Sequence, residues 1–267
     1  MPYAENSGVR IYWEEHGQGD PLLLIMGLSY TLEMWHRTTP VLSQHYRTII
    51  FDNRGVGRSD VPSGAYSIPE MAADAAAVMD SAGVDRAHVL GVSMGGMIAQ
   101  EFALQYPQRV RSLILGCTSH GGPEAVLADS EVLTTLAARG MMSAEEGVRA
   151  MVSFVYDPGT PSERIEEDLA IRARTFPTIQ GYFGQIQAIL AYESRSRLNQ
   201  LKVPTLVVHG ETDRLVPPEN GRRLACSING ARLVIIPKAS HIFPTDQPEK
   251  AHQVILGFLA QQSGESR

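Results

Sequence analysis

Short runs rich in apolar and β-branched residues alternate along this chain with longer stretches of helical periodicity. The runs in the middle of the chain, such as 21–26 and 87–92, are almost continuously apolar, which is typical of strands buried on both faces of a sheet. Parallel strands need long crossover connections, and the helical stretches supply them. The pattern therefore predicts an α/β fold with a mostly parallel central sheet flanked by helices. The predicted strands are 9–16, 21–26, 47–52, 87–92, 110–116, 204–210 and 231–237.

Capping signals mark the ends of the helices expected between these strands. Ser67 and Glu70 stand at the spacing of a capping box, and Gly83 ends the same stretch. Asp246 and Glu249 form a second capping pair near the C-terminus. The predicted helices in this part of the chain span 67–83, 94–107 and 246–262.

The segment 120–202 contains no convincing strand. It carries several amphipathic helical patterns separated by Gly, Pro and Ser residues. A helical insertion of this length between two strands of one sheet predicts a lid over the sheet edge. We therefore expect a helical lid, or cap, at 120–202, inserted into an α/β core made of residues 1–119 and 203–267.

Composition narrows the classes of function. The 267 residues carry a formal net charge of -6 without a basic run, so we expect no nucleic-acid partner. The longest apolar run is too short to cross a bilayer, and the first residues lack a signal-peptide pattern. We therefore predict a cytoplasmic protein without a membrane partner. A homodimer is compatible with the sequence.

No cofactor is expected either. Two cysteines make no disulfide framework, and no Cys/His cluster has the spacing of a metal site. The stretch 51–62, "FDNRGVGRSDVP", contains G-x-G but lacks the G-K-[ST] of a phosphate loop and the spacing of a dinucleotide fingerprint. We interpret it as a structural turn whose polar side chains bond backbone groups and one another.

The stretch "GVSMG", 91–95, points to chemistry. It matches G-x-S-x-G between a predicted strand and a predicted helix, which is the context of a nucleophile elbow. A sharp turn there would expose the Ser93 hydroxyl, and the flanking glycines would leave room for the turn to pack. The alternative is that Ser93 only caps the helix. The surrounding strand and helix favour the nucleophile.

A nucleophilic serine needs a base and an orienting acid. Asp213 stands in a loop after the predicted strand 204–210, and His241 follows the last predicted strand. This order of Ser, Asp and His is the one that an elbow of this kind predicts. Glu211 competes with Asp213 for the acid, and the loop position favours Asp213.

The sequence also indicates an oxyanion hole and a substrate pocket. Gly27 lets the loop after strand 21–26 approach a substrate oxygen, so the N–H groups of Leu28 and Met94 are the expected oxyanion donors. Lid residues rich in Met, Phe, Tyr and Leu indicate an apolar pocket. The expected pocket residues are Gly27, Trp35, His120, Tyr182 and Ile242.

Taken together, these motifs resemble the α/β-hydrolase fold superfamily over nearly the whole chain. The resemblance rests on "DNRGVGRSD", "GVSMGG", "HGETDRLVP" and "ASH". The stretches 188–198 and 217–243 are most similar to the carboxylesterase and 3-oxoadipate enol-lactonase-like group. The resemblance implies Ser93 as nucleophile, His241 as base and Asp213 as orienting acid. A serine at the nucleophile position, where dehalogenases and epoxide hydrolases have aspartate, argues against those branches.

The sequence therefore predicts a serine hydrolase that cleaves a carboxylic ester or lactone of a small, largely apolar molecule without a cofactor or metal. A lid arginine facing the serine would suit a substrate with a carboxylate. Residues 120–202 contain seven arginines, and the sequence does not choose among them. Two alternatives stay open. One is a carbon–carbon bond hydrolase of the same fold, and the other is a ligand receptor with slow turnover.

Overall fold

The computed structural model describes residues 3–262, whose centre is one eight-stranded sheet. The strand order is β1-β2-β4-β3-β5-β6-β7-β8, and all neighbours from β4 onward are parallel. The pairs β1–β2 and β2–β4 are antiparallel. The predicted α/β fold is therefore confirmed. The strands are β1 (Tyr3–Asn6), β2 (Val9–His16), β3 (Pro21–Ile25), β4 (Arg47–Phe51), β5 (Ala87–Val92), β6 (Val110–Gly116), β7 (Thr205–Gly210) and β8 (Arg232–Ile236).

The first strand was missed by sequence reasoning. It is only four residues long and contains no β-branched residue, and it pairs with β2 through a two-residue turn. Both turn residues, Ser7 and Gly8, have positive φ (51° and 80°), as a type I′ hairpin requires. Pairing with β2, and not an apolar pattern, makes this segment a strand.

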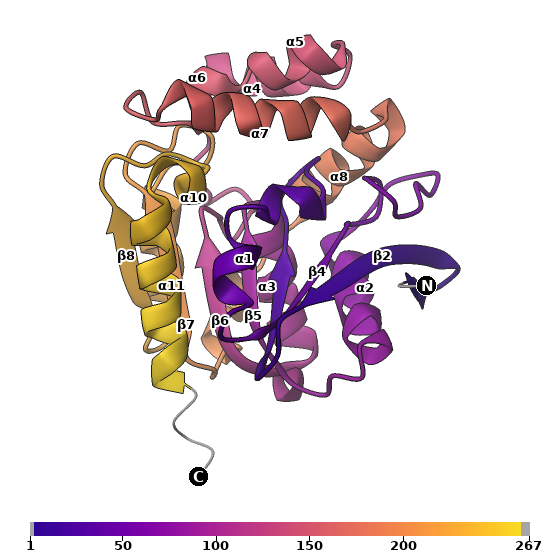
Figure 1. The fold of residues 1–267 in the computed structure, drawn as a ribbon, viewed down its shortest axis with the longest axis vertical. Coiled ribbons are helices and arrows are strands. Elements are labelled where there is room, and N and C mark those ends of the chain that lie inside the picture. Colours follow the sequence, from indigo (N-terminus) through magenta and orange to yellow (C-terminus); the bar gives the residue numbers. More distant parts are fainter. Residues whose placement is uncertain (1–2, 263–267) are drawn as a thin grey trace.

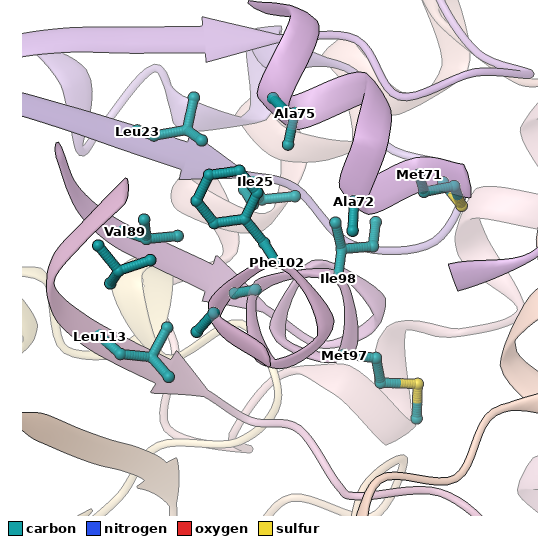
Figure 2. Close-up of a cluster of buried hydrophobic side chains, with 14 of the residues drawn as sticks. Leu23, Ile25, Met71, Ala72, Ala75, Val89, Met97, Ile98, Phe102 and Leu113 are labelled. Carbon is teal, nitrogen blue, oxygen red and sulfur yellow. The ribbon is translucent and has the colours of Figure 1, made fainter. Parts of the chain in front are cut away.

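Helices cover both faces of the sheet, which explains why its central strands are apolar throughout. On one face, α2 (Ile68–Ser81) and α3 (Met94–Gln105) pack against alternate residues such as Leu23 and Ile25. Figure 2 shows these two side chains beside Phe102 of α3. On the other face, Leu22 and Leu24 belong to the core under α11 (Pro248–Gln262).

The remaining core helices are short. They are η1 (Leu32–Trp35), α1 (Thr39–Leu42), η2 (Pro107–Arg109), α9 (Glu219–Ser227) and α10 (Phe243–Asp246).

Between β6 and β7 the described chain forms helices and a single isolated bridge, Gly121 with Glu193. Helices α4 to α7 lie above the end of the sheet, and α8 runs down toward β4 (Figure 1). None of the helices within residues 3–262 is long and apolar enough to cross a membrane. The elements of this helical segment are α4 (Ser130–Arg139), α5 (Ala144–Arg149), α6 (Val152–Val155), α7 (Ser162–Arg174), α8 (Ile179–Ala191) and η3 (Arg195–Gln200).

The polar stretch after β4 is a structural turn, as expected. The Asp52 carboxylate accepts the N–H groups of Leu32 (2.8 Å) and Arg58 (2.9 Å), and the Ser59 hydroxyl donates to the Asp52 carbonyl (2.6 Å). Arg54 departs from the expectation that the polar residues bond one another. Its guanidinium pairs with buried Asp74 of α2 at 2.6 and 2.8 Å, which ties the turn to the helix layer.

Candidate active site

Ser93 stands alone between β5 and α3, with φ 56° and ψ −123°. Such a conformation costs a non-glycine residue about 1–3 kcal/mol, so the surroundings must enforce it. The Ser93 N–H donates to Gly116 O of β6 (2.8 Å), and its carbonyl accepts the Thr118 hydroxyl (2.7 Å). Its side chain makes no capping bond to α3. The hydroxyl is therefore presented by a strained turn and is not used to cap the helix.

The glycines on both sides of Ser93 allow strand and helix to approach this closely. A Cβ on Gly91 would overlap the carbonyl of Gly95, and a Cβ on Gly95 would overlap the carbonyl of Ile25 and lie 2.6 Å from Met26 O. Backbone atoms are the obstacle at both positions, so the clash could not be relieved by a side-chain rotation. The elbow can form only where both residues lack a side chain.

The predicted acid and base are in direct contact. His241 follows β8, and its Nδ1 lies 2.8 Å from Asp213 Oδ2 in the loop after β7. The other oxygen of Asp213 accepts the N–H groups of Leu215 (3.0 Å) and Val216 (2.9 Å). Burial acts to raise the pKa of the Asp213 carboxyl, but the charges and hydrogen bonds of the neighbouring histidines outweigh it, so this pKa lies below its usual range. Asp213 is thus held as a carboxylate against His241.

The competing acid points elsewhere. Glu211 is exposed, and its carboxylate accepts the backbone N–H of Lys238. It makes no contact with His241 among the hydrogen bonds and ion pairs of the described chain. Of the two carboxylates in this loop, Asp213 therefore points toward His241 and Glu211 points away from it.

A second histidine touches the same carboxylate. His209, in β7, lies with Nε2 3.3 Å from Asp213 Oδ2 and 2.8 Å from Val216 O. Because a carbonyl only accepts, Nε2 carries the proton. This contact with Asp213 was not predicted from the sequence. Its sequence signal is the spacing of four residues across the end of a buried strand.

The loop after β3 crosses closely over the nucleophile. A Cβ on Gly27 would stand 3.0 Å from Ser93 Cβ and 3.5 Å from its Oγ. Leu28 and Met94 line the same cavity as Ser93. Neither of their N–H groups has an acceptor within residues 3–262, and the first N–H groups of a helix such as α3 lack partners in the helix itself. Both donors are therefore free to bind a developing oxyanion.

A cavity of about 350 Å³ joins these groups. Ser93 and His241 lie in its wall, and the rest is mainly apolar, drawn from the core and from the helical segment. Gly27, Trp35 and Ile242 line it, as expected. Its apolar lining also includes Met34, Met97, Leu133, Met151, Val155 and Leu190.

Two expected pocket residues do not line the cavity. The Nδ1 atom of His120 bonds Gly121 O (2.7 Å), and the ring is fully buried at the start of the helical segment. The Tyr182 hydroxyl donates to Leu136 O (2.7 Å), and the residue is only 1% exposed. Both predictions were wrong because these side chains pack the segment itself, which sequence position alone does not reveal.

Only one of the seven candidate arginines within the described chain lines the cavity, namely Arg139. Its guanidinium is buried and donates from Nε to Gly147 O (3.0 Å) and from Nη1 to Ser29 Oγ (2.7 Å). Burial lowers its pKa. The other six are engaged elsewhere: Arg149 with Glu166, Arg164 with Thr245 O, Arg172 with Tyr156, Arg174 with Glu33, Arg195 with Glu124 and Arg197 with Glu101.

Cys117, Asp213 and His241 have ligand atoms within 4.8 Å of one another, so we tested this group as a metal site. Burial raises the pKa of the Cys117 thiol well above its usual value, which keeps it protonated. The Asp213 and His241 atoms already share a proton at 2.8 Å. A metal would have to displace that proton and ionise the thiol, so the residues do not fit a resident metal.

Asp246 is not the helix cap that the sequence predicted. It ends α10, and its carboxylate accepts Ser240 N–H (2.6 Å), the Thr160 hydroxyl (2.6 Å) and Asp157 N–H (3.3 Å). Burial raises its pKa to about 6 despite these donors. Asp246 thereby links the loop that carries His241 to the turn between α6 and α7, a contact that a local capping pattern cannot indicate.

Comparison with known proteins adds a family context. Residues 20–248 match the family model described as "alpha/beta hydrolase fold". A protein of Azorhizobium caulinodans named "Putative carbamate hydrolase RutD" is 35% identical over 98% of this chain and 99% of its own length. A "2-hydroxy-6-oxononadienedioate/2-hydroxy-6-oxononatrienedioate hydrolase" of Paraburkholderia phymatum is 30% identical over 95% of this chain and 92% of its own. The solved enol-lactonase from Burkholderia xenovorans LB400 superimposes with a TM-score of 0.87 at 27% identity, covering 97% of this chain and 100% of that one.

Proposed function

The chain belongs to the α/β-hydrolase fold family, and on that premise we propose that it is a serine hydrolase that cleaves a carboxylic ester or lactone of a small, largely apolar molecule. That the protein is a hydrolase follows from its relatives. The observation that carries the finer proposal is the strained Ser93, which shares one apolar cavity with His241, itself bonded to Asp213.

The proposed reaction is acyl transfer through Ser93. His241 takes the hydroxyl proton as Ser93 Oγ attacks the carbonyl carbon, and Asp213 stabilises the imidazolium that forms. The N–H groups of Leu28 and Met94 bind the oxyanion, each contributing about 3 kcal/mol to the lowering of the barrier. His241 then protonates the leaving alkoxide. Water, activated by the same histidine, hydrolyses the acyl-enzyme.

We further propose that residues 120–202 act as a lid on a core made of 1–119 and 203–267. The cavity supports this division, since its walls come from both parts: Ser93 and His241 from the core, Leu133 and Leu190 from the helical segment. Substrate choice would then lie in the helical segment, and the catalytic groups in the core. The mainly apolar lining favours an apolar acyl or alcohol group.

The names of two relatives suggest other carbonyl substrates, which should be compared directly with esters. A carbamate presents the same carbonyl to the same groups, and the relative from Azorhizobium is named for that activity. Hydrolysis of a carbon–carbon bond in a vinylogous diketone is the second candidate, and the Paraburkholderia relative is named for a substrate of that kind. The third alternative is a ligand receptor with slow turnover. Multiple turnovers on simple esters would argue against it.

The test is steady-state hydrolysis of p-nitrophenyl acetate, butyrate and octanoate by the wild type, Ser93→Ala and Ser81→Ala. Ser81 is exposed at the end of α2, so its variant controls for loss of a hydroxyl. We expect saturable turnover that is lost only in Ser93→Ala. Turnover that survives in Ser93→Ala would refute the nucleophile assignment. A p-nitrophenyl carbamate and a vinylogous diketone, run beside the esters, rank the candidate substrates by kcat/KM.

A further inference from the structure

Ser29, in the loop that crosses over Ser93, has φ 64°. The Tyr30 N–H bonds Gly27 O (3.5 Å), so residues 27–30 form a turn with Ser29 at its third position. A type II turn requires positive φ there and normally uses glycine. A serine keeps such a conformation only when its neighbours enforce it. What enforces it here comes from the helical segment.

Gln185, on α8, is the first of these neighbours. It is completely buried, and its Oε1 accepts the Ser29 N–H at 2.7 Å. Its Nε2 donates to Arg54 O at 2.8 Å. The two partners fix the orientation of the amide, because a flipped amide would set two donors against each other at Ser29. Gln185 therefore joins the loop over Ser93 to the turn after β4.

Helix α8 is itself fixed to that turn. A Cβ on Gly181 would overlap the carbonyl of Gly55, so helix and turn are in backbone contact. Asn53 of the same turn donates to Met26 O (2.8 Å), and Asp52 accepts Leu32 N–H (2.8 Å). The loop is thus held on both sides of Leu28, at Met26, Ser29 and Leu32, by α8 and the turn after β4.

Arg139 supplies the second restraint on Ser29. Its Nη1 bonds the Ser29 hydroxyl at 2.7 Å, and both groups are only 3% exposed. Arg139 belongs to α4, whereas Gln185 belongs to α8. Two helices of the segment therefore converge on one strained residue, and that residue directly follows Leu28.

We propose that Gln185 is a positioning residue for the oxyanion hole, assisted by Arg139. By fixing Ser29 it fixes the turn that aims the Leu28 N–H at the substrate oxygen, so the oxyanion hole is complete only when the helical segment is seated. The proposal rests on the proposed function, since it assigns Gln185 a part in the same acyl transfer. The turn after β4, which carries no chemistry of its own, is the base on which Gln185 rests.

The test compares Gln185→Met with Gln187→Met, using an oxoester and the thionoester with the same acyl and leaving groups. Methionine keeps the size of glutamine, but its sulfur is only a weak acceptor for Ser29 N–H and cannot donate to Arg54 O. Gln187 is exposed on the same helix and serves as the matched control. Because sulfur is a weak acceptor, an oxyanion hole accelerates the oxoester far more than the thionoester.

In Gln185→Met we expect kcat for the oxoester to fall about 10- to 100-fold with KM nearly unchanged, while the thionoester rate stays within about threefold. The oxo-to-thiono rate ratio should therefore fall by about tenfold or more, and it should not change in Gln187→Met. Ser29→Gly, which removes the bond to Arg139 and frees the backbone, should lower the ratio as well. It replaces Gln185→Met if that variant does not fold.

An equal loss of rate on the oxoester and the thionoester would show general damage and overturn the proposal. An unchanged oxo-to-thiono rate ratio in both Gln185→Met and Ser29→Gly would overturn it as well. Ser93→Ala, measured on the same two esters, separates this failure from failure of the proposed function. If Ser93→Ala is inactive and the ratio is unchanged in the loop variants, only the role of Gln185 is wrong. If Ser93→Ala is active, both proposals are refuted.

Discussion

The buried carboxyl of Asp246 should make the stability of the protein depend on pH in an unusual direction. Burial raises its pKa from 3.8 to about 6, so between these values the folded protein binds a proton that the unfolded chain has lost. Its contribution to the free energy of unfolding is full below about pH 4 and is lost as pH rises through about 6. The gap between the two pKa values corresponds to about 3 kcal/mol.

The variant Asp246→Asn isolates this contribution, because asparagine keeps the shape and does not ionise. Urea unfolding of both proteins, followed by tryptophan fluorescence between about pH 4 and about pH 7, gives the difference in their free energies of unfolding. The wild type should lose about 2.5 kcal/mol relative to the variant over this range, because all other titrating groups are common to both. Asparagine also turns its NH₂ toward one of the three donors, which adds a constant offset.

A difference that stays constant with pH would refute the reasoning. A difference that grows in favour of the wild type as pH rises would show that the hydrogen bonds from Ser240, Thr160 and Asp157 outweigh burial. In that case Asp246 would act as an ordinary buried carboxylate.

Two further predictions concern the elbow and the acid. Gly95→Ala should lower the free energy of unfolding by about 3 kcal/mol or more and abolish the proposed ester hydrolysis, because its Cβ meets backbone of β3. Gly257→Ala, at an exposed position of α11 with open space around the new methyl, should instead raise the melting temperature through helix propensity. Equal effects of the two substitutions in thermal denaturation would contradict the steric argument. Asp213→Asn should lower kcat by about 10⁴-fold with little change in KM, since the amide cannot hold the His241 tautomer, and a loss below about tenfold would remove Asp213 from the proposed triad.

The sequence determined those features that depend on neighbours along the chain. Continuous apolar runs indicated the central strands, such as β3 and β5, since a strand buried on both faces has no polar side to show. The glycines around Ser93 indicated the elbow because only residues without Cβ allow a strand to turn so sharply into a helix. The positions of Asp213 and His241 after consecutive strands also followed, because parallel strands end at one edge of a sheet.

Only the tertiary structure decided which distant side chains meet. Gln185 lies 156 residues from Ser29, and a glutamine within an amphipathic helix looks like any surface residue. Tyr182, on the same helix, was expected in the cavity but packs inside the segment. Asp246 matched a capping pattern, yet its donors come from residues 86 and 89 positions away as well as from nearby Ser240. Periodicity tells which face of a helix is buried, but the partner on that face is set by how the layers are stacked, and this information is not local in the chain.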